Sequence, residues 1–132
     1  MEQPKSKQVV LLNDDETILT RVMAQELSDI GLESIRTSNF AEAMETYEKH
    51  HPNLIVSDLH MPNGGALELI DWIGEKFNEQ PPAIIITGVI EDSVDRSKYP
   101  SVVEVLHKPL DLEHLLHLIA KNLQGSHSKS SA

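Results

Sequence analysis

Hydrophobic residues in this chain form short, mostly apolar runs that alternate with longer stretches in which apolar positions recur every three or four residues. The first pattern predicts strands buried on both faces, and the second predicts amphipathic helices. The predicted strands are residues 9–12, 34–38, 54–56, 83–86 and 102–106, of which 34–38 has the weakest pattern. The predicted helices are residues 18–30, 41–50, 66–78 and 112–123. Gly31 and Pro52 agree with the ends of the first two helices.

The alternation of strands and helices predicts the fold class. Apolar strands separated by helices indicate a parallel sheet covered on both faces. Right-handed crossovers then give a three-layer α/β sandwich. Residues 89–100 fit this pattern poorly, because they have few apolar positions and contain Ser93, Ser97 and Pro100. We therefore expect the fourth helix, between the last two strands, to be short, irregular or mobile.

The two ends of the chain differ in composition from its middle. The first residues are polar, and residues 124–132 are rich in serine and lack apolar anchors. We expect a flexible N-terminus at 1–6, one domain at 7–123 and a disordered C-terminal tail at 124–132. A chain of 132 residues suits a single domain of this kind.

The charge balance and the absence of cysteine exclude several functions. The chain has 11 Lys and Arg residues against 21 Asp and Glu residues, a net charge of −10 with neutral histidine. This balance argues against partners such as nucleic acid or an anionic membrane. Without cysteine, disulfides, thiol nucleophiles and cysteine-based metal sites are excluded. No apolar run reaches the ~20 residues of a membrane span and no signal-peptide core is visible, so we expect a cytoplasmic protein.

Polar side chains follow four of the five predicted strands. They are Asp14 and Asp15 after the first strand, Asp58 after the third, Thr87 after the fourth and Lys108 after the fifth. Ligands of open parallel sheets bind beyond the carboxyl ends of the strands. We therefore expect three carboxylates, one hydroxyl and one ammonium group to converge at one edge of the sheet.

This set of side chains suits metal-assisted phosphoryl chemistry. Three neighbouring carboxylates repel one another, and a divalent cation removes that conflict. A site of oxygen ligands favours Mg²⁺, with Mn²⁺ as a second candidate, over zinc. Lys108 and Thr87 would contact a transferring phosphoryl group, and one carboxylate could attack phosphorus to form an aspartyl phosphate.

Each of these residues also has a simpler interpretation. Asp14 and Asp15 could merely cap the following helix, and Asp58 and Lys108 could belong to ordinary turns. Separate coincidences at the ends of four of the five strands, with complementary chemistry, are less plausible than one site. By contrast, His114 and His117 form only half of a metal site, so we interpret them as surface residues.

The motifs at the strand ends resemble those of response-regulator receiver domains of two-component phosphorelays. The resemblance covers about residues 7–123. It rests on Asp14-Asp15, on the run from Asp58 through Leu59, His60 and Met61 to Pro62, on Thr87-Gly88 and on Lys108-Pro109. The family implies a flavodoxin-like fold with a five-stranded parallel sheet in the order 2-1-3-4-5.

The resemblance also implies a role for each matching residue. Asp58 would accept a phosphoryl group from a phosphohistidine of a histidine kinase or phosphotransfer protein. Asp15 would bind Mg²⁺ directly and Asp14 through water, and the backbone carbonyl of His60 would be a further ligand beside Asp58. Thr87 and Lys108 would contact the phosphoryl oxygens, and the Lys108-Pro109 bond would be cis. Family members dephosphorylate themselves, and they often dimerise.

The sequence departs from the family pattern at three places. Val105 occupies a position at which family members commonly carry Tyr or Phe, and the rotamer of that aromatic side chain follows the movement of the threonine. Ala66 occupies a position that usually carries glycine, with Gly64-Gly65 just before it. Residues 89–100, the region of the fourth helix, are also atypical. His60 and Val89 flank the expected phosphoryl position, and the family relates these two positions to the lifetime of the phosphate. The resemblance therefore implies a lifetime unlike that of the chemotaxis proteins.

We interpret the chain as a stand-alone phosphoacceptor that switches contacts with an unidentified downstream protein. It would not be an enzyme acting on external substrates, although it would catalyse its own phosphorylation and dephosphorylation. Two alternatives remain open. One is a receiver-like interaction module that works without phosphorylation, and the other is a small Mg²⁺-dependent phosphatase. The intact acidic set argues against the first, and the lack of a second acid–base carboxylate argues against the second.

Overall fold

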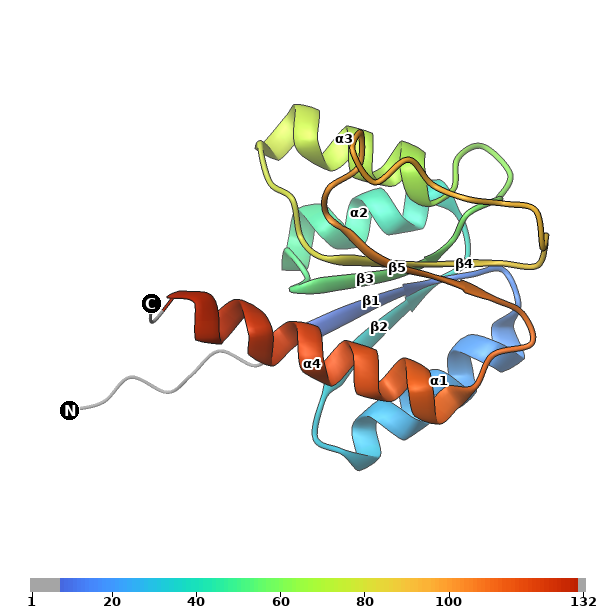
Figure 1. Cartoon of the computed structure of the whole chain (residues 1–132), viewed down its shortest axis with the longest axis vertical. Coiled ribbons are helices and arrows are strands. Elements are labelled where there is room, and N and C mark those ends of the chain that lie inside the picture. The colour runs from blue at the N-terminus through green and yellow to red at the C-terminus, as the bar shows by residue number, and fades with distance from the viewer. Residues whose placement is uncertain (1–7, 131–132) are drawn as a thin grey trace.

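One parallel sheet contains the strands β1 (Val9–Asn13), β2 (Glu33–Thr37), β3 (Leu54–Asp58), β4 (Ala83–Thr87) and β5 (Val102–His107). The computed structural model describes the backbone of residues 8–130 and the side chains of residues 8–123. The strand order is β2-β1-β3-β4-β5, and every neighbouring pair is parallel (Figure 1). The predicted fold class and the order implied by the resemblance are both confirmed.

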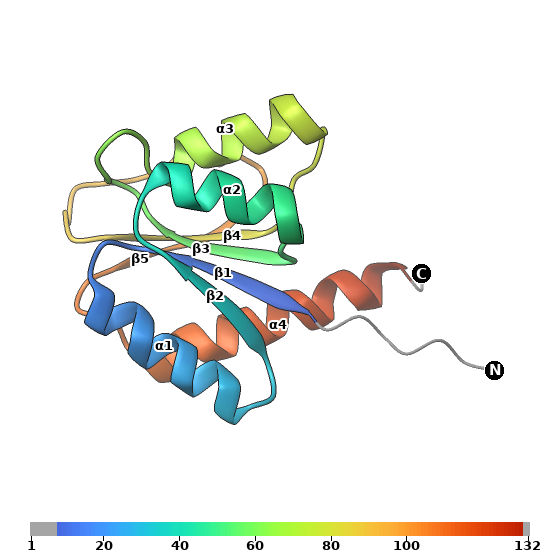
Figure 2. The same cartoon turned by 180° about the vertical axis from the view of Figure 1, so that it is seen from behind.

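Helices cover both faces of the sheet. They are α1 (Thr17–Asp29), α2 (Phe40–His50), α3 (Ala66–Phe77) and α4 (Leu112–Ser130). Figures 1 and 2 show α1 and α4 together on one face and α2 and α3 together on the other. Within the described residues, no helix combines the length and apolarity needed to cross a membrane. The result is the predicted three-layer sandwich.

The burial of each strand explains its apolar pattern. All five residues of β3 and of β4 are buried, because helices cover these central strands on both sides. Along β1, Val10 and Leu12 belong to the core beneath α1 and α4, whereas Leu11 belongs to the core beneath α2 and α3. The strand β2 lies at the edge of the sheet and is only partly buried, which accounts for its weak apolar pattern.

The connection between β4 and β5 has no helix. Residues 88–101 form a series of turns, one of which is closed by Asp95, whose side chain accepts hydrogen bonds from the backbone and hydroxyl of Ser97. Val94 and Tyr99 pack against the core beneath α2 and α3. The predicted short or irregular fourth helix is therefore replaced by turns, because too few apolar residues are available to form a helix face.

The ends of the chain fall partly outside the description. The predicted flexible segment 1–6 lies outside the described residues. The helix α4 extends to Ser130 rather than ending at residue 123, but the side chains of residues 124–132 are not described. The predicted disordered tail stays a prediction. Earlier in α4, Leu115 and Ile119 are buried, as expected for a core-facing stripe.

The loop between β3 and α3 makes one close backbone approach, at Gly65. A Cβ atom placed on Gly65 would lie 2.0 Å from the carbonyl oxygen of Leu59. The backbone N–H of Gly65 donates a hydrogen bond of 2.9 Å to the Glu68 side chain in the first turn of α3. The need for glycine thus falls at Gly65, and Ala66 is free to begin the helix.

We predict that Gly65→Ala lowers the free energy of unfolding by about 2–4 kcal/mol, because the new methyl group collides with backbone rather than with a flexible side chain. Urea denaturation monitored by circular dichroism would measure the change. Gly74→Ala in α3 is the matched control, since no atom lies within 4 Å of a Cβ placed there. That control should raise stability by about 0.5–1 kcal/mol, and equal losses in the two variants would contradict the prediction.

Candidate functional site

Three carboxylates meet at the carboxyl edge of the sheet, as predicted. Asp14 and Asp15 follow β1, and Asp58 is the last residue of β3. One oxygen atom from each of the three lies within 4.8 Å of the others. Asp14 is 2% exposed and Asp58 is 8% exposed, whereas Asp15 faces solvent. Two largely buried acids and one accessible acid therefore share one small volume.

Lys108, after β5, places a positive charge against this cluster. Its Nζ atom lies 3.2 Å from Asp14 Oδ2 and 3.4 Å from Asp58 Oδ2, and it also bonds the side chain of Glu16. Partial burial by itself would lower the pKa of Lys108, but the bond to Glu16 and the charges of Asp14 and Asp58 outweigh burial and raise that pKa. Lys108 is therefore charged at neutral pH. The Lys108-Pro109 bond is cis, as the resemblance implies.

Asp14 carries an incompletely satisfied buried oxygen. Its Oδ1 atom accepts a hydrogen bond of 2.9 Å from the backbone N–H of Glu16. Its Oδ2 atom is buried and accepts no well-directed hydrogen bond, although Lys108 lies close enough to form an ion pair. Burial raises the pKa of Asp14, the Glu16 N–H and Lys108 offset part of that rise, and the charge of Asp58 adds to it. A cation ligand would satisfy this oxygen.

A chain of hydrogen bonds lies behind the acidic cluster and joins three strands. The Thr37 hydroxyl donates to Asn13 Oδ1 at 2.8 Å, and Asn13 Nδ2 donates to the Ser57 hydroxyl at 3.3 Å. Ser57 in turn donates to the backbone carbonyl of Asp58 at 3.1 Å. All four residues are buried. Sequence reasoning missed this support, although a polar residue at or next to the end of three strands was an available signal.

Thr87 ends β4 as predicted, but its hydroxyl is already bonded. It donates to Asp92 Oδ2 at 2.7 Å and accepts from the backbone N–H of Val89 at 3.1 Å. The His60 ring also bonds Asp92 Oδ2, at 2.7 Å, while the His60 backbone N–H donates to Asp58 Oδ1 at 3.2 Å. The structure thus brings Asp58 and Lys108 together and joins Thr87 to Asp92. Neither Asp92 nor Glu16 was identified from the sequence.

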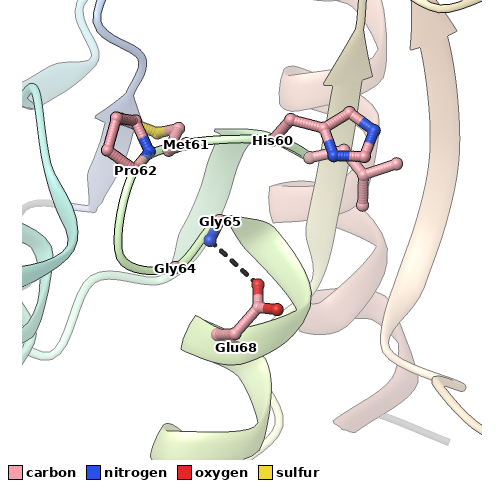
Figure 3. A pocket seen from close by; sticks show the side chains of 7 residues that line it. His60, Met61, Pro62, Gly64, Gly65 and Glu68 are labelled. Carbon is pink, nitrogen blue, oxygen red and sulfur yellow. Dashed lines mark hydrogen bonds between the residues drawn. The ribbon is translucent and has the colours of Figure 1, made fainter.

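A small cavity borders the loop that follows Asp58. Its volume is about 380 Å³, and its walls come from the loop and the first turn of α3, including Met61, Gly65 and Glu68. Figure 3 shows His60 on the side of this loop away from Met61 and Pro62. His60 is thereby free to reach Asp92. His114 and His117 are exposed on α4 and join no cluster of metal-binding side chains among the described residues, as expected.

We predict that Asp14→Asn stabilises the metal-free protein by about 1–2 kcal/mol at neutral pH, because it removes a poorly compensated buried charge. A carboxyl group whose pKa is raised by folding binds more protons when folded. Asp14 therefore contributes a fall in the free energy of unfolding as pH rises from its ordinary pKa of 3.8 through the raised pKa, and this contribution is absent in Asp14→Asn. Urea denaturation across this pH range in chelator would measure both effects. Asp15→Asn, which changes the exposed acid, is the control and should change the free energy of unfolding by less than about 0.5 kcal/mol. If Asp14→Asn lowered the free energy of unfolding, Asp14 would not be a poorly compensated buried charge.

Comparison with known proteins agrees with this geometry. Response regulator protein PilR from Pseudomonas aeruginosa is 27% identical over 119 residues, which are 90% of this chain and 27% of PilR. The chain thus spans about a quarter of that relative. The polar-differentiation response regulator DivK from Brucella ovis is 23% identical over 89% of this chain and 97% of DivK.

Solved structures share the fold. A CheY-like response regulator receiver domain protein from Methanospirillum hungatei superposes with a TM-score of 0.80 at 22% identity, covering 94% of this chain and 99% of that one. The response regulator protein TrrA from Thermotoga maritima, in complex with Mg²⁺-BeF, gives a TM-score of 0.74 at 23% identity and covers 87% of this chain and 98% of TrrA. Residues 10–120 match the family described as the response regulator receiver domain. The chain belongs to the response regulator receiver domain family, whose members are phosphoacceptor signalling domains of two-component systems.

Proposed function

We propose that Asp58 of this chain accepts a phosphoryl group from a phosphohistidine of a histidine kinase or phosphotransfer protein, in a reaction that depends on Mg²⁺. The observation that carries the proposal is the position of Asp58. Its carboxylate lies in a cluster with Asp14 and Asp15, 3.4 Å from the ammonium group of Lys108. Membership of the receiver family supports the class of donor.

The acidic cluster fits a magnesium ion. Asp14, Asp15 and Asp58 offer oxygen ligands, and the buried Asp14 Oδ2 has no well-directed hydrogen bond to lose. We propose these residues and the backbone carbonyl of His60 as the protein ligands, with Mn²⁺ as a second candidate ion. TrrA, which shares the fold, was solved in complex with Mg²⁺-BeF, and this supports magnesium as the ion. A bound Mg²⁺ would neutralise charge on the carboxylates and on the incoming phosphoryl oxygens.

Asp58 and Lys108 have different roles in the transfer of the phosphoryl group. A carboxylate oxygen of Asp58 forms a bond to phosphorus as the bond from phosphorus to the donor's imidazole nitrogen breaks. Lys108 balances the negative charge that the phosphoryl group brings, and it would exchange its bond with Glu16 for a phosphoryl oxygen. The carboxyl edge is open to solvent at Asp15, so a water molecule can later hydrolyse the acyl phosphate.

The protein phosphorylated at Asp58 would act through contacts with other proteins. A phosphoryl group adds roughly 1.5 to 2 negative charges to an already acidic edge. We propose that this change alters the surface near the β4–β5 connection and so selects a downstream protein or a second copy of the chain. The alternative is an interaction module that keeps this fold without being phosphorylated. The departure at Val105, which packs partly buried against the core, is the observation that favours the alternative.

We predict that incubation with Mg²⁺ and acetyl phosphate adds the mass of one phosphoryl group to the protein, because the three acids and Lys108 already lie together before phosphorylation. Intact mass spectrometry would measure the gain. Asp58→Asn should lose it, whereas Asp71→Asn on α3, whose carboxylate bonds Tyr99 instead, should keep it. Absence of the gain in the wild-type protein would favour the interaction module.

We predict that Mg²⁺ raises the melting temperature of the wild-type protein, because it binds the folded site and not the unfolded chain. At about 100 times the dissociation constant the stabilisation should approach 2.7 kcal/mol. Asp15→Asn should reduce this response strongly, since Asp15 is the accessible carboxylate of the cluster. Differential scanning calorimetry with and without Mg²⁺ would measure it, and Glu113→Gln in the first turn of α4 is a control for loss of charge. An Asp15→Asn response equal to that of the wild type would exclude Asp15 as a ligand.

A further inference from the structure

The single hydroxyl hydrogen of Thr87 is bonded within the β4–β5 connection. Thr87 is completely buried, and its hydroxyl donates to Asp92 Oδ2 at 2.7 Å while accepting from the Val89 N–H at 3.1 Å. A threonine hydroxyl has a single hydrogen to donate. Thr87 therefore cannot donate to a phosphoryl oxygen at Asp58 while it donates to Asp92.

Asp92 is itself held in place on more than one side. Its backbone N–H donates to the Val89 carbonyl at 3.1 Å and closes a turn. The oxygen atom that accepts from Thr87 also bonds His60 Nε2 at 2.7 Å. Asp92 thus links the end of β4 to the loop that carries His60, two residues beyond Asp58. The bond from Thr87, followed by the contact with His60, lowers the pKa of Asp92, so its carboxylate is ionised at neutral pH.

We propose that Asp92 is a positioning residue that holds the Thr87 hydroxyl away from the phosphorylation site, and that phosphorylation of Asp58 requires Thr87 to leave Asp92. The proposal rests on the function proposed above, because it assigns to Thr87 a contact with the phosphoryl group. The phosphoryl oxygens and the Asp92 carboxylate are competing acceptors for one hydrogen. Asp92 therefore disfavours the phosphorylated state, and the phosphorylated state weakens the hold of Asp92.

Loss of the hydrogen bond between Thr87 and Asp92 would alter one part of the β4–β5 connection. The turn that Asp92 closes presents Val89 and Ile90, which are 44% and 79% exposed. Farther along, Tyr99 packs on the core and its hydroxyl bonds Asp71. The contacts of Tyr99 do not involve Asp92, so they can persist. Since this connection has no helix, loss of the Asp92 bonds would move the turn with the two exposed apolar residues and leave the far end in place.

The test compares Asp92→Ala with Glu91→Gln, which removes a neighbouring carboxylate that is exposed to solvent. The ligand is beryllofluoride at saturating Mg²⁺, titrated by calorimetry. Asp92→Ala should bind it about three- to tenfold more tightly than the wild type, because no competing bond has to break. The beryllofluoride affinity of Asp92→Asn should lie between those of the wild type and Asp92→Ala, because the asparagine amide is a weaker and uncharged acceptor. The beryllofluoride affinity of Glu91→Gln should stay within about twofold of the wild-type value. The affinity of every variant for Mg²⁺ alone should also stay within about twofold of the wild-type affinity for Mg²⁺.

A second measurement separates positioning from a general effect on folding. In NMR spectra without ligand, the Val89 amide of Asp92→Ala should shift toward its position in the beryllofluoride-bound wild type, because the Thr87 hydroxyl is released in advance. An unchanged or weaker beryllofluoride affinity in Asp92→Ala, or an equal gain in Glu91→Gln, would overturn the proposal. If the wild type binds no beryllofluoride and gains no phosphoryl group, the proposed function fails instead, so the two failures are distinguishable.

Discussion

Repulsion among the carboxylates at the carboxyl edge of the sheet is the constraint on which the rest of this structure depends. Asp14, Asp15 and Asp58 bring three negative charges within 4.8 Å, and two of them are buried. Such a cluster is costly unless positive charge lies close by. Lys108 supplies one such charge from the far end of the chain, and Glu16 holds it in place. The remaining imbalance makes the edge suitable for a divalent cation.

The fold meets this constraint by keeping the edge rigid. Parallel strands deliver their last residues to one side of the sheet, and the central strands are buried on both faces. The chain of hydrogen bonds from Thr37 through Asn13 and Ser57 to the Asp58 carbonyl ties three of those strand ends together. The close approach of Gly65 to Leu59 then fixes the loop that leaves the site. The charged groups therefore have little freedom to move apart.

The β4–β5 connection is the part of the domain that links Thr87 to the surface through turns rather than a helix. It has turns where a helix was expected, and it is attached to the site by the Thr87–Asp92–His60 bonds and to the core by Val94 and Tyr99. Val105, in β5, offers no aromatic ring to follow the threonine. A change at Asp58 would therefore reach the surface through Asp92 and the turn beside it, rather than through a moving ring or helix.

The apolar periodicity of the sequence was enough to predict the sheet and its helical layers, because burial on both faces of a strand leaves a local pattern. The polar residues at the strand ends were enough to predict which side chains meet at one edge, because parallel strands end on the same side of a sheet. Those residues are Asp14, Asp15, Asp58, Thr87 and Lys108. The partners of these residues were not predictable in that way. Lys108 bonds Glu16 across 92 positions of sequence, and Thr87 donates to Asp92 rather than toward the acids. Such pairings depend on how loops lie against one another once packed. Local sequence carries no periodic signal for them, so only the tertiary structure decides them.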